Sequence, residues 1–231
     1  MATLLGLDFG TGGIRVGVFD LETRRMLGER EEPYETDYPR PGWAEQSPLD
    51  WWDALGRTCR ALMADLGAPE IAGICVATTA STVVACKRDG TPLRPALLWM
   101  DCRAAAEAER SAASTNPVMD FVGGANASEW LISKAMWLAT HEPAVYAEAD
   151  ILCECLDYIN FLLTGHWVGS RMNATCKWNY DSVGKRFPAE LYAEFGVEGL
   201  EAKLPPEIFA VGAPIDRISA EAAAHLGLSN R

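Results

Sequence analysis

The first 34 residues contain three apolar or alternating stretches, separated by short polar or glycine-rich connections. Residues 4–9 and 14–20 are rich in Leu, Ile and Val, which favours two strands joined by a turn. Residues 26–34 are more polar and predict a third strand at or near a sheet edge. Three strands before any helix favour an antiparallel meander over a dinucleotide-binding start.

A helix is predicted next, because Ser47, Pro48 and Asp50 supply an N-cap, a first-turn proline and an acidic first turn. Apolar residues recur at helical spacing up to Gly67, which provides a stop. Further strands are predicted over 71–78, which looks buried, and over 82–87, 96–100, 149–155 and 213–218. Helices are predicted over 101–113, 129–139, 156–163, 189–195 and 220–226. This order predicts an α/β domain whose mixed sheet has three leading antiparallel strands and helices on its faces.

Composition narrows the class of protein. Of 231 residues, 49 % are hydrophobic and 23 % charged, which is typical of a globular domain with a core. The net charge of −12, with Lys and Arg scattered, argues against nucleic-acid binding. No stretch approaches the ~20 apolar residues of a membrane span, so no membrane partner is expected. The seven cysteines, without a C-x-x-C pair, predict reduced core thiols in a cytoplasmic protein and no metal site at Cys153 and Cys155.

The insert DFGTGG, residues 8–13, has two interpretations that the residues alone leave open. It is a hairpin whose glycines adopt positive φ, or a loop whose backbone N–H groups bind phosphate. In the second case Thr11 adds a hydroxyl, Asp8 suits Mg²⁺ or its waters, and Arg15 adds a forked positive charge. Neither G-x-x-x-x-G-K-[ST] nor a complete G-x-G-x-x-G is present, so two familiar phosphate loops are excluded.

Five ordered segments together resemble the FGGY carbohydrate kinases of the actin-like ATPase superfamily. They are GLDFGTGGIRVGVFD (Gly6–Asp20), PGWAEQSPLDWWDAL (Pro41–Leu55), RDGTPLRPALLWMDCRA (Arg88–Ala104), EWLISKAMWLATHEPAVY (Glu129–Tyr146) and LDYINFLLTG (Leu156–Gly165). Within the family, ATCKWNYD (Ala174–Asp181) and TTASTVV (Thr78–Val84) resemble ribulokinase-type members. The Arg-Glu pair of glycerol kinases and the Met-His pair of xylulokinases are both replaced near Thr79–Thr82.

The resemblance implies a ribonuclease H-like, actin-like ATPase domain that takes part in ATP-dependent phosphorylation of a sugar hydroxyl. It implies that ATP and Mg²⁺ are cofactors, and that the phosphates are bound by Asp8, Gly10, Thr11, Gly12, Gly13 and Arg15, with Asp8 holding the metal through water. It points to sugar contacts at Ala80, Trp99, Asp101, Glu129, Trp130 and Lys177. Other interpretations stay open: both Trp side chains as core, Asp101 with Arg103 as a helix cap and surface ion pair, and Lys177 as a solvated residue.

The family's general base is an Asp in a G-G-x-D motif, which the resemblance places beyond Arg231, followed by a second actin-like domain. Residues 1–231 are therefore expected to form the N-terminal domain of a two-domain kinase and to be inactive alone. The expected substrate is a ketopentose such as ribulose. Alternatives are xylulose, erythritol or another polyol, or a non-catalytic sugar-binding domain. A homodimer is also considered.

Overall fold

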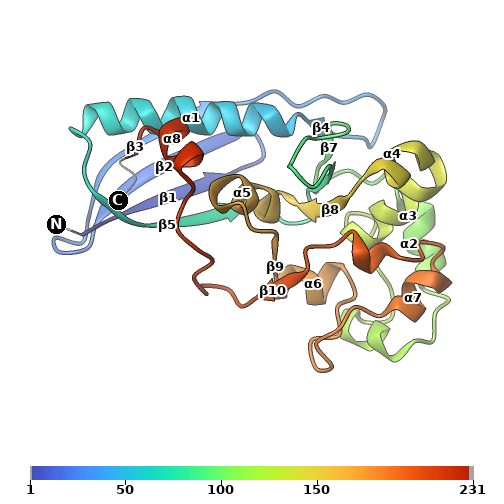
Figure 1. Ribbon diagram of the computed structural model, residues 1–231. Coiled ribbons are helices and arrows are strands. Elements are labelled where there is room, and N and C mark those ends of the chain that lie inside the picture. Colours follow the sequence, from blue (N-terminus) through green and yellow to red (C-terminus); the bar gives the residue numbers. More distant parts are fainter. Residues whose placement is uncertain (1, 229–231) are drawn as a thin grey trace.

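The computed structural model describes residues 2–228 (Figure 1). Its strands are β1 (Thr3–Phe9), β2 (Gly13–Asp20), β3 (Arg25–Pro33), β4 (Glu45–Gln46), β5 (Ile71–Thr78), β6 (Val83–Cys86), β7 (Ala96–Leu97), β8 (Ile151–Glu154), β9 (Val168–Ser170) and β10 (Glu207–Phe209). Its α-helices are α1 (Pro48–Asp65), α2 (Ala105–Ser111), α3 (Leu131–His141), α4 (Pro143–Glu148), α5 (Cys155–Thr164), α6 (Arg171–Lys177), α7 (Ala189–Glu194) and α8 (Ala220–Leu226). Two 3₁₀ helices, Pro117–Val122 and Leu200–Ala202, complete the secondary structure of these residues.

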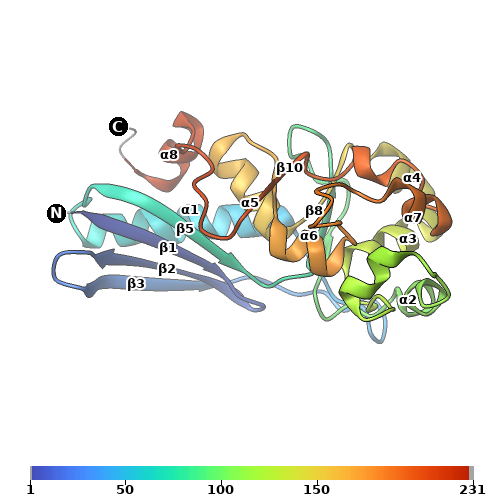
Figure 2. The ribbon, with the colours of Figure 1, turned by 90° about the horizontal axis from the view of Figure 1, so that it is seen from below.

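The first sheet confirms the predicted meander. Its strand order is β3-β2-β1-β5, with β1, β2 and β3 antiparallel to one another and β5 parallel to β1. Residues of β1 and β2 alternate between buried and more exposed positions. The buried side contributes to a core formed with α1, α5 and α8. Figure 2 shows α1 behind the sheet. One face of the sheet is therefore covered by helices, while the other carries the partly exposed Asp8 and Arg15.

Helix α1 begins as its sequence predicts. Ser47 is the N-cap, with its side chain accepting from the N–H of Asp50 at 3.4 Å, and Pro48 occupies the first turn. The helix ends at Asp65, just before Gly67, whose φ of +71° suits a residue without a side chain. This long helix spans the sheet and fixes the direction in which the chain enters β5 (Figure 1).

Sequence patterns were less accurate beyond α1. The first sheet is the expected mixed sheet, but not all strands join it: β4-β7-β6-β8 form a second four-stranded sheet, and β9 pairs with β10 in a third. Strand β5 was expected to be buried but is only partly so, because it lies at the edge of the first sheet and pairs only with β1 among the described strands. The expected strand over 213–218 is wrong, since the strand forms at Glu207–Phe209, where it pairs in parallel with β9. Helix α2 begins at Ala105 instead of Asp101, and α6 was not predicted.

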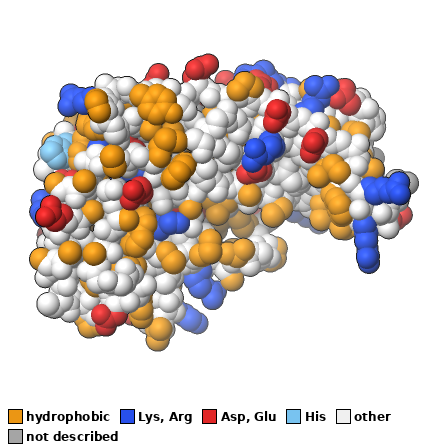
Figure 3. Space-filling view, turned by 180° about the vertical axis from the view of Figure 1, so that it is seen from behind, with side chains coloured by type: hydrophobic (Ala, Val, Ile, Leu, Met, Phe, Trp, Pro, Cys, Tyr) orange, Lys and Arg blue, Asp and Glu red, His pale blue; other side chains and the backbone are white. Residues whose placement is uncertain are grey.

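Three sequence-based expectations concern surface charge, membrane-spanning helices and the exposure of the cysteines. On the face seen in Figure 3, Lys and Arg side chains lie singly or in small groups, without forming one basic patch. No helix within residues 2–228 is both long and apolar enough to cross a bilayer. Four cysteines are buried, but Cys75, Cys102 and Cys176 are exposed, so the expectation that the thiols belong to the core is wrong for these three.

Candidate functional site

The glycine-rich loop, residues 10–13, is tied to the protein through its carbonyl groups. The Tyr34 hydroxyl donates to the carbonyl of Gly10, and Gln46 Nε2 donates to that of Thr11 at 2.7 Å. The carbonyls of the two following glycines accept backbone hydrogen bonds at 3.3 and 3.0 Å. Burial raises the pKa of Tyr34, which keeps its hydroxyl a donor. All four loop carbonyls are therefore engaged within the protein.

The opposite side of the loop is free to meet a ligand. The N–H groups of Thr11 and Gly12 donate to no acceptor within the described part of the chain. A Cβ at Gly12 would meet no atom within 4 Å, whereas one at Gly13 would lie 2.6 Å from the carbonyl oxygen of Glu32. The loop does connect the expected hairpin of β1 and β2, but none of its glycines has a positive φ, so that part of the expectation is wrong. At position 13 the lack of space for a side chain is what requires glycine. Adjacent unused N–H groups on an open surface suit an anion such as phosphate.

Asp8 and Arg15 lie opposite each other in the β1–β2 register and form an ion pair. Arg15 Nε donates to Asp8 Oδ2 at 3.0 Å, and Arg15 Nη2 donates to the same oxygen. The side chains are 42 % and 61 % exposed, respectively, and the bond to Asp8 raises the pKa of Arg15. The two groups expected to meet metal and phosphate thus neutralise each other here. A ligand that takes one of them must compete with the other.

Trp99 joins the loop to the second sheet. Its indole Nε1 donates to Thr11 Oγ1 at 3.0 Å, and its backbone N–H donates to Thr82 Oγ1 at 3.2 Å. Thr82 Oγ1 also lies 3.1 Å from Thr79 Oγ1. The side chain of Trp99 is 42 % exposed, so much of its ring remains accessible beside the loop. The structure therefore brings a predicted sugar contact against a predicted phosphate contact, although 88 residues separate them in sequence.

Four other predicted sugar contacts lie at three places along the chain. Ala80 lies in the turn between β5 and β6, and Glu129 and Trp130 immediately precede α3. Lys177 ends α6, and its Nζ lies 3.4 Å from Asn173 Oδ1. All four side chains are partly buried, so the structure offers each of them some contact with solvent.

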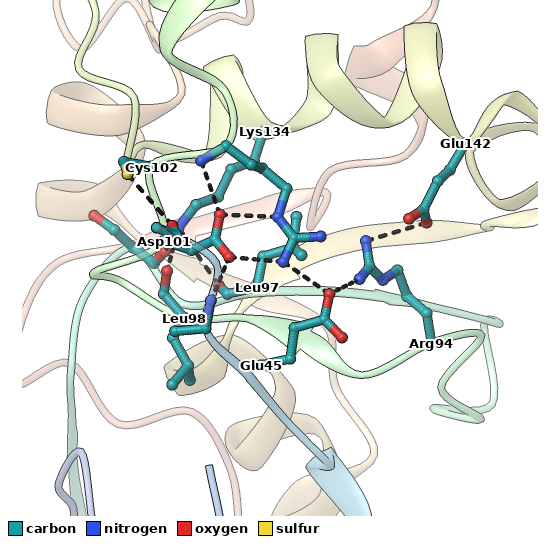
Figure 4. A network of polar contacts seen from close by, with 12 residues as sticks. Glu45, Arg94, Leu97, Leu98, Asp101, Cys102, Lys134 and Glu142 are labelled. Atoms are coloured by element: carbon teal, nitrogen blue, oxygen red, sulfur yellow. Dashed lines mark hydrogen bonds and ion pairs between the residues drawn. The ribbon is translucent and has the colours of Figure 1, made fainter. Parts of the chain in front are cut away.

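Asp101 requires a correction. Its side chain is completely buried, and its oxygens accept from the N–H of Ala44 at 2.7 Å and from Arg103 Nε and Nη2 at 2.8 and 2.7 Å. The side chain of Arg103 is equally buried, and its guanidinium carbon lies 3.8 Å from the centre of the Trp43 ring. The pair is thus an interior ion pair, neither a sugar contact nor a surface pair. Figure 4 shows it continuing through Glu45 to Arg94 and Glu142.

Sequence reasoning missed four residues that support this region. Tyr34 and Gln46 hold the loop carbonyls, but no local pattern distinguishes them from other residues of a strand end and a connection. Lys134 and Glu154, both completely buried, hold backbone groups near Ala80 and Trp99. These two did leave a signal, because each is a single charge within an apolar run, LISKAMWL and ILCEC.

Comparison with known proteins gives this geometry its context. The model of the FGGY family of carbohydrate kinases, N-terminal domain, matches residues 3–231. The chain belongs to this family. Its fold is that of the same part of a xylulose kinase from Rhodospirillum rubrum, with a TM-score of 0.87, 28 % identity and coverage of 98 % of this chain and 46 % of that one. The predicted actin-like ATPase domain, with its mixed sheet and helices, is thereby confirmed.

Curated relatives give the same assignment. The chain is 26 % identical over 170 residues to xylulose kinase from Escherichia coli (strain K12), covering 74 % of this chain and 35 % of that protein. It is 30 % identical over 217 residues to glycerol kinase from Thermococcus onnurineus (strain NA1), covering 89 % of this chain and 44 % of that protein. The chain thus spans less than half the length of these relatives.

Proposed function

We propose that this chain is the sugar- and phosphate-binding domain of an ATP-dependent carbohydrate kinase that phosphorylates a hydroxyl of a ketopentose. The observation that carries the proposal is the hydrogen bond between Trp99 Nε1 and Thr11 Oγ1. Phosphoryl transfer depends mainly on positioning an acceptor hydroxyl against the γ-phosphate. The Trp99 ring would pack against the sugar, and the loop of residues 10–13 would bind the phosphates. Their contact would therefore bring the acceptor hydroxyl and the γ-phosphate together.

Each ligand has a complementary set of groups. The N–H groups of Thr11 and Gly12, with Arg15, suit the phosphates of ATP. The partly exposed carboxylate of Asp8 suits a hydrated Mg²⁺, which would neutralise phosphate charge, once Arg15 turns from Asp8 toward phosphate. For the sugar we propose Ala80, Trp99, Glu129, Trp130 and Lys177, because carboxylate and ammonium groups bond hydroxyls and Trp rings pack on C–H faces.

The identity of the sugar rests on the turn Thr79–Thr82. It lacks the charged or His-bearing pairs of glycerol and xylulose kinases, which favours ribulose. Xylulose is the second candidate, since two of the proteins described above are named xylulose kinase. One is 26 % identical to this chain, and the other is 28 % identical and has the same fold. Erythritol, another polyol or a binding role without catalysis are further alternatives. We further propose that the general base and the adenosine site belong to a second domain, as the length of the relatives suggests.

Binding and turnover test the proposal separately. D-ribulose, D-xylulose, glycerol and erythritol are titrated into the isotope-labelled chain while the indole N–H signal of Trp99, assigned with Trp99→Phe, is followed. We expect ribulose or xylulose to shift that signal more than glycerol. ADP release is then measured with the chain joined to its second domain and with residues 1–231 alone, which are expected to be inactive. If no sugar shifts the Trp99 signal, the proposed site is wrong.

A further inference from the structure

The turn that carries Ala80 has a constrained backbone. Ser81, the next residue, has a φ of +70°, which is unusual for a residue with a side chain. Its N–H donates to Glu154 Oε2 at 2.6 Å, and its carbonyl accepts from Lys134 Nζ at 2.8 Å. These two charged side chains come from β8 and α3 and are both completely buried. The conformation of the turn is thus maintained from both sides by opposite interior charges.

Lys134 also bonds the backbone immediately before Trp99. Its Nζ donates to the carbonyl of Leu98 at 2.6 Å and approaches that of Leu97 at 3.5 Å, as Figure 4 shows. An ammonium group has three donors, and together with Ser81 these carbonyls provide three acceptors. Burial lowers the pKa of Lys134 to about 7, while nearby carboxylates oppose that shift. A buried cation is costly, and every hydrogen bond recorded for Lys134 Nζ goes to a backbone carbonyl beside Ala80 or Trp99, while carboxylates nearby favour its charge.

Glu154 extends the connection to α6. Besides Ser81, it accepts from Asn173 Nδ2 at 3.0 Å and from Trp178 Nε1 at 2.9 Å. Asn173 is in turn the residue whose Oδ1 lies 3.4 Å from Lys177 Nζ. Burial raises the pKa of Glu154, and the hydrogen bonds from Ser81 and Trp178 and the charges of Lys177 and Lys134 only partly oppose that shift. One carboxylate therefore links the turn with the helix that ends in a proposed sugar contact.

We infer that Lys134 and Glu154 are positioning residues of the sugar site, which fix Ala80, Trp99 and Lys177 relative to one another without contacting the sugar. This inference rests on the proposed function, because those three residues are the proposed contacts. It also makes a claim about the backbone that holds whether or not a sugar binds. The two parts can be measured independently.

The test uses Lys134→Met, which keeps the length of the side chain and removes its donors. Amide hydrogen exchange at residues 79–82 and 98–99 reports the backbone, with β1 and β2 amides as the reference for global unfolding. Affinity for D-ribulose and D-xylulose reports the sugar site. We expect exchange at those residues to be roughly tenfold faster and affinity to fall roughly tenfold, since several bonds to a charged donor are lost. The matched control is Lys203→Met, which removes another Lys-to-carbonyl bond, to Ala149 at 2.5 Å, and is expected to change neither.

Each outcome has a distinct meaning. Unchanged exchange at residues 79–82 and 98–99 would overturn the inference. Faster exchange with unchanged affinity would show that the network is only structural, which also overturns it. If the unaltered chain binds neither sugar, the proposed function and the sugar part fail, whereas the exchange result still decides the backbone part. Should Lys134→Met not fold, Glu154→Gln, which is isosteric and loses one acceptor, is judged by the same two measurements.

Discussion

The substitution Asp101→Asn separates a structural carboxylate from a sugar ligand. The carboxylate of Asp101 accepts hydrogen bonds from Ala44 and from three N–H groups of Arg103, at 2.7 to 3.0 Å. Asn keeps one acceptor oxygen and turns the other position into a donor that faces N–H groups. Arg103 then remains buried with Glu45, 2.7 Å away, as its only carboxylate partner among the described residues.

The expected cost follows from that geometry. Removing one partner of a buried ion pair destabilises a protein by about 3–5 kcal/mol, and the remaining contact with Glu45 favours the lower end. We therefore expect Asp101→Asn to lower the free energy of unfolding by about 3 kcal/mol. In a chain of this length that corresponds to a fall in Tm of roughly 6–12 °C.

Urea and thermal unfolding, followed by circular dichroism, measure this loss, and sugar affinity is measured on the folded variant. Asp65→Asn is the matched control, because it removes the same charge from an exposed pair with Arg30 and should cost under about 1 kcal/mol. A sugar ligand would behave differently, losing affinity with little loss of stability. That pattern in Asp101→Asn would refute the assignment of Asp101 to the interior.

Four further predictions concern the loop, the sugar wall and pH. In the two-domain kinase, Arg15→Ala and Thr11→Ala should lower kcat about tenfold or more while changing sugar affinity little, because both act at the phosphates; wild-type turnover in both would exclude the phosphate role. Lys177→Ala should raise the sugar KM several-fold, since one charged hydrogen bond is lost. Unchanged KM and kcat would show that Lys177 is a solvated residue without a role in sugar binding. Trp99→Phe keeps an aromatic ring, though a smaller one, and removes the donor to Thr11, so binding of sugar and of nucleotide, measured with and without the other ligand, should become less coupled; equal coupling in both proteins would contradict the role of that bond. The folded-state pKa of Lys134, about 7, lies below its usual 10.5, so the unfolded state binds more protons between those values and stability rises with pH there. Above pH 7.5, the free energy of unfolding of the unaltered chain, relative to that of Lys134→Met, should rise by up to about 1.4 kcal/mol per pH unit. If the difference between the two proteins does not change with pH up to pH 9, the three carbonyls keep the pKa of Lys134 near its usual value.

Local sequence determined the elements whose signals lie within a few residues. The meander of β1, β2 and β3, the capped start of α1 and the bounds of α8 were predicted because alternation, capping and helical spacing act between near neighbours. The five ordered motifs determined the family, which the match over residues 3–231 bears out. The glycine-rich loop was also found from sequence, although the positive φ expected for its glycines was wrong.

Tertiary structure alone decided which polar groups are interior and which are offered to a ligand. Asp101 was expected to contact sugar, but it bonds Ala44, 57 residues away, and is enclosed by Arg103. Glu154 reaches Ser81 across 73 residues. The loop presents N–H groups because Tyr34 and Gln46 engage its carbonyls from outside the local sequence. The free energy of a charged group depends on the donors and acceptors that surround it, and for these groups the fold supplies them from distant segments.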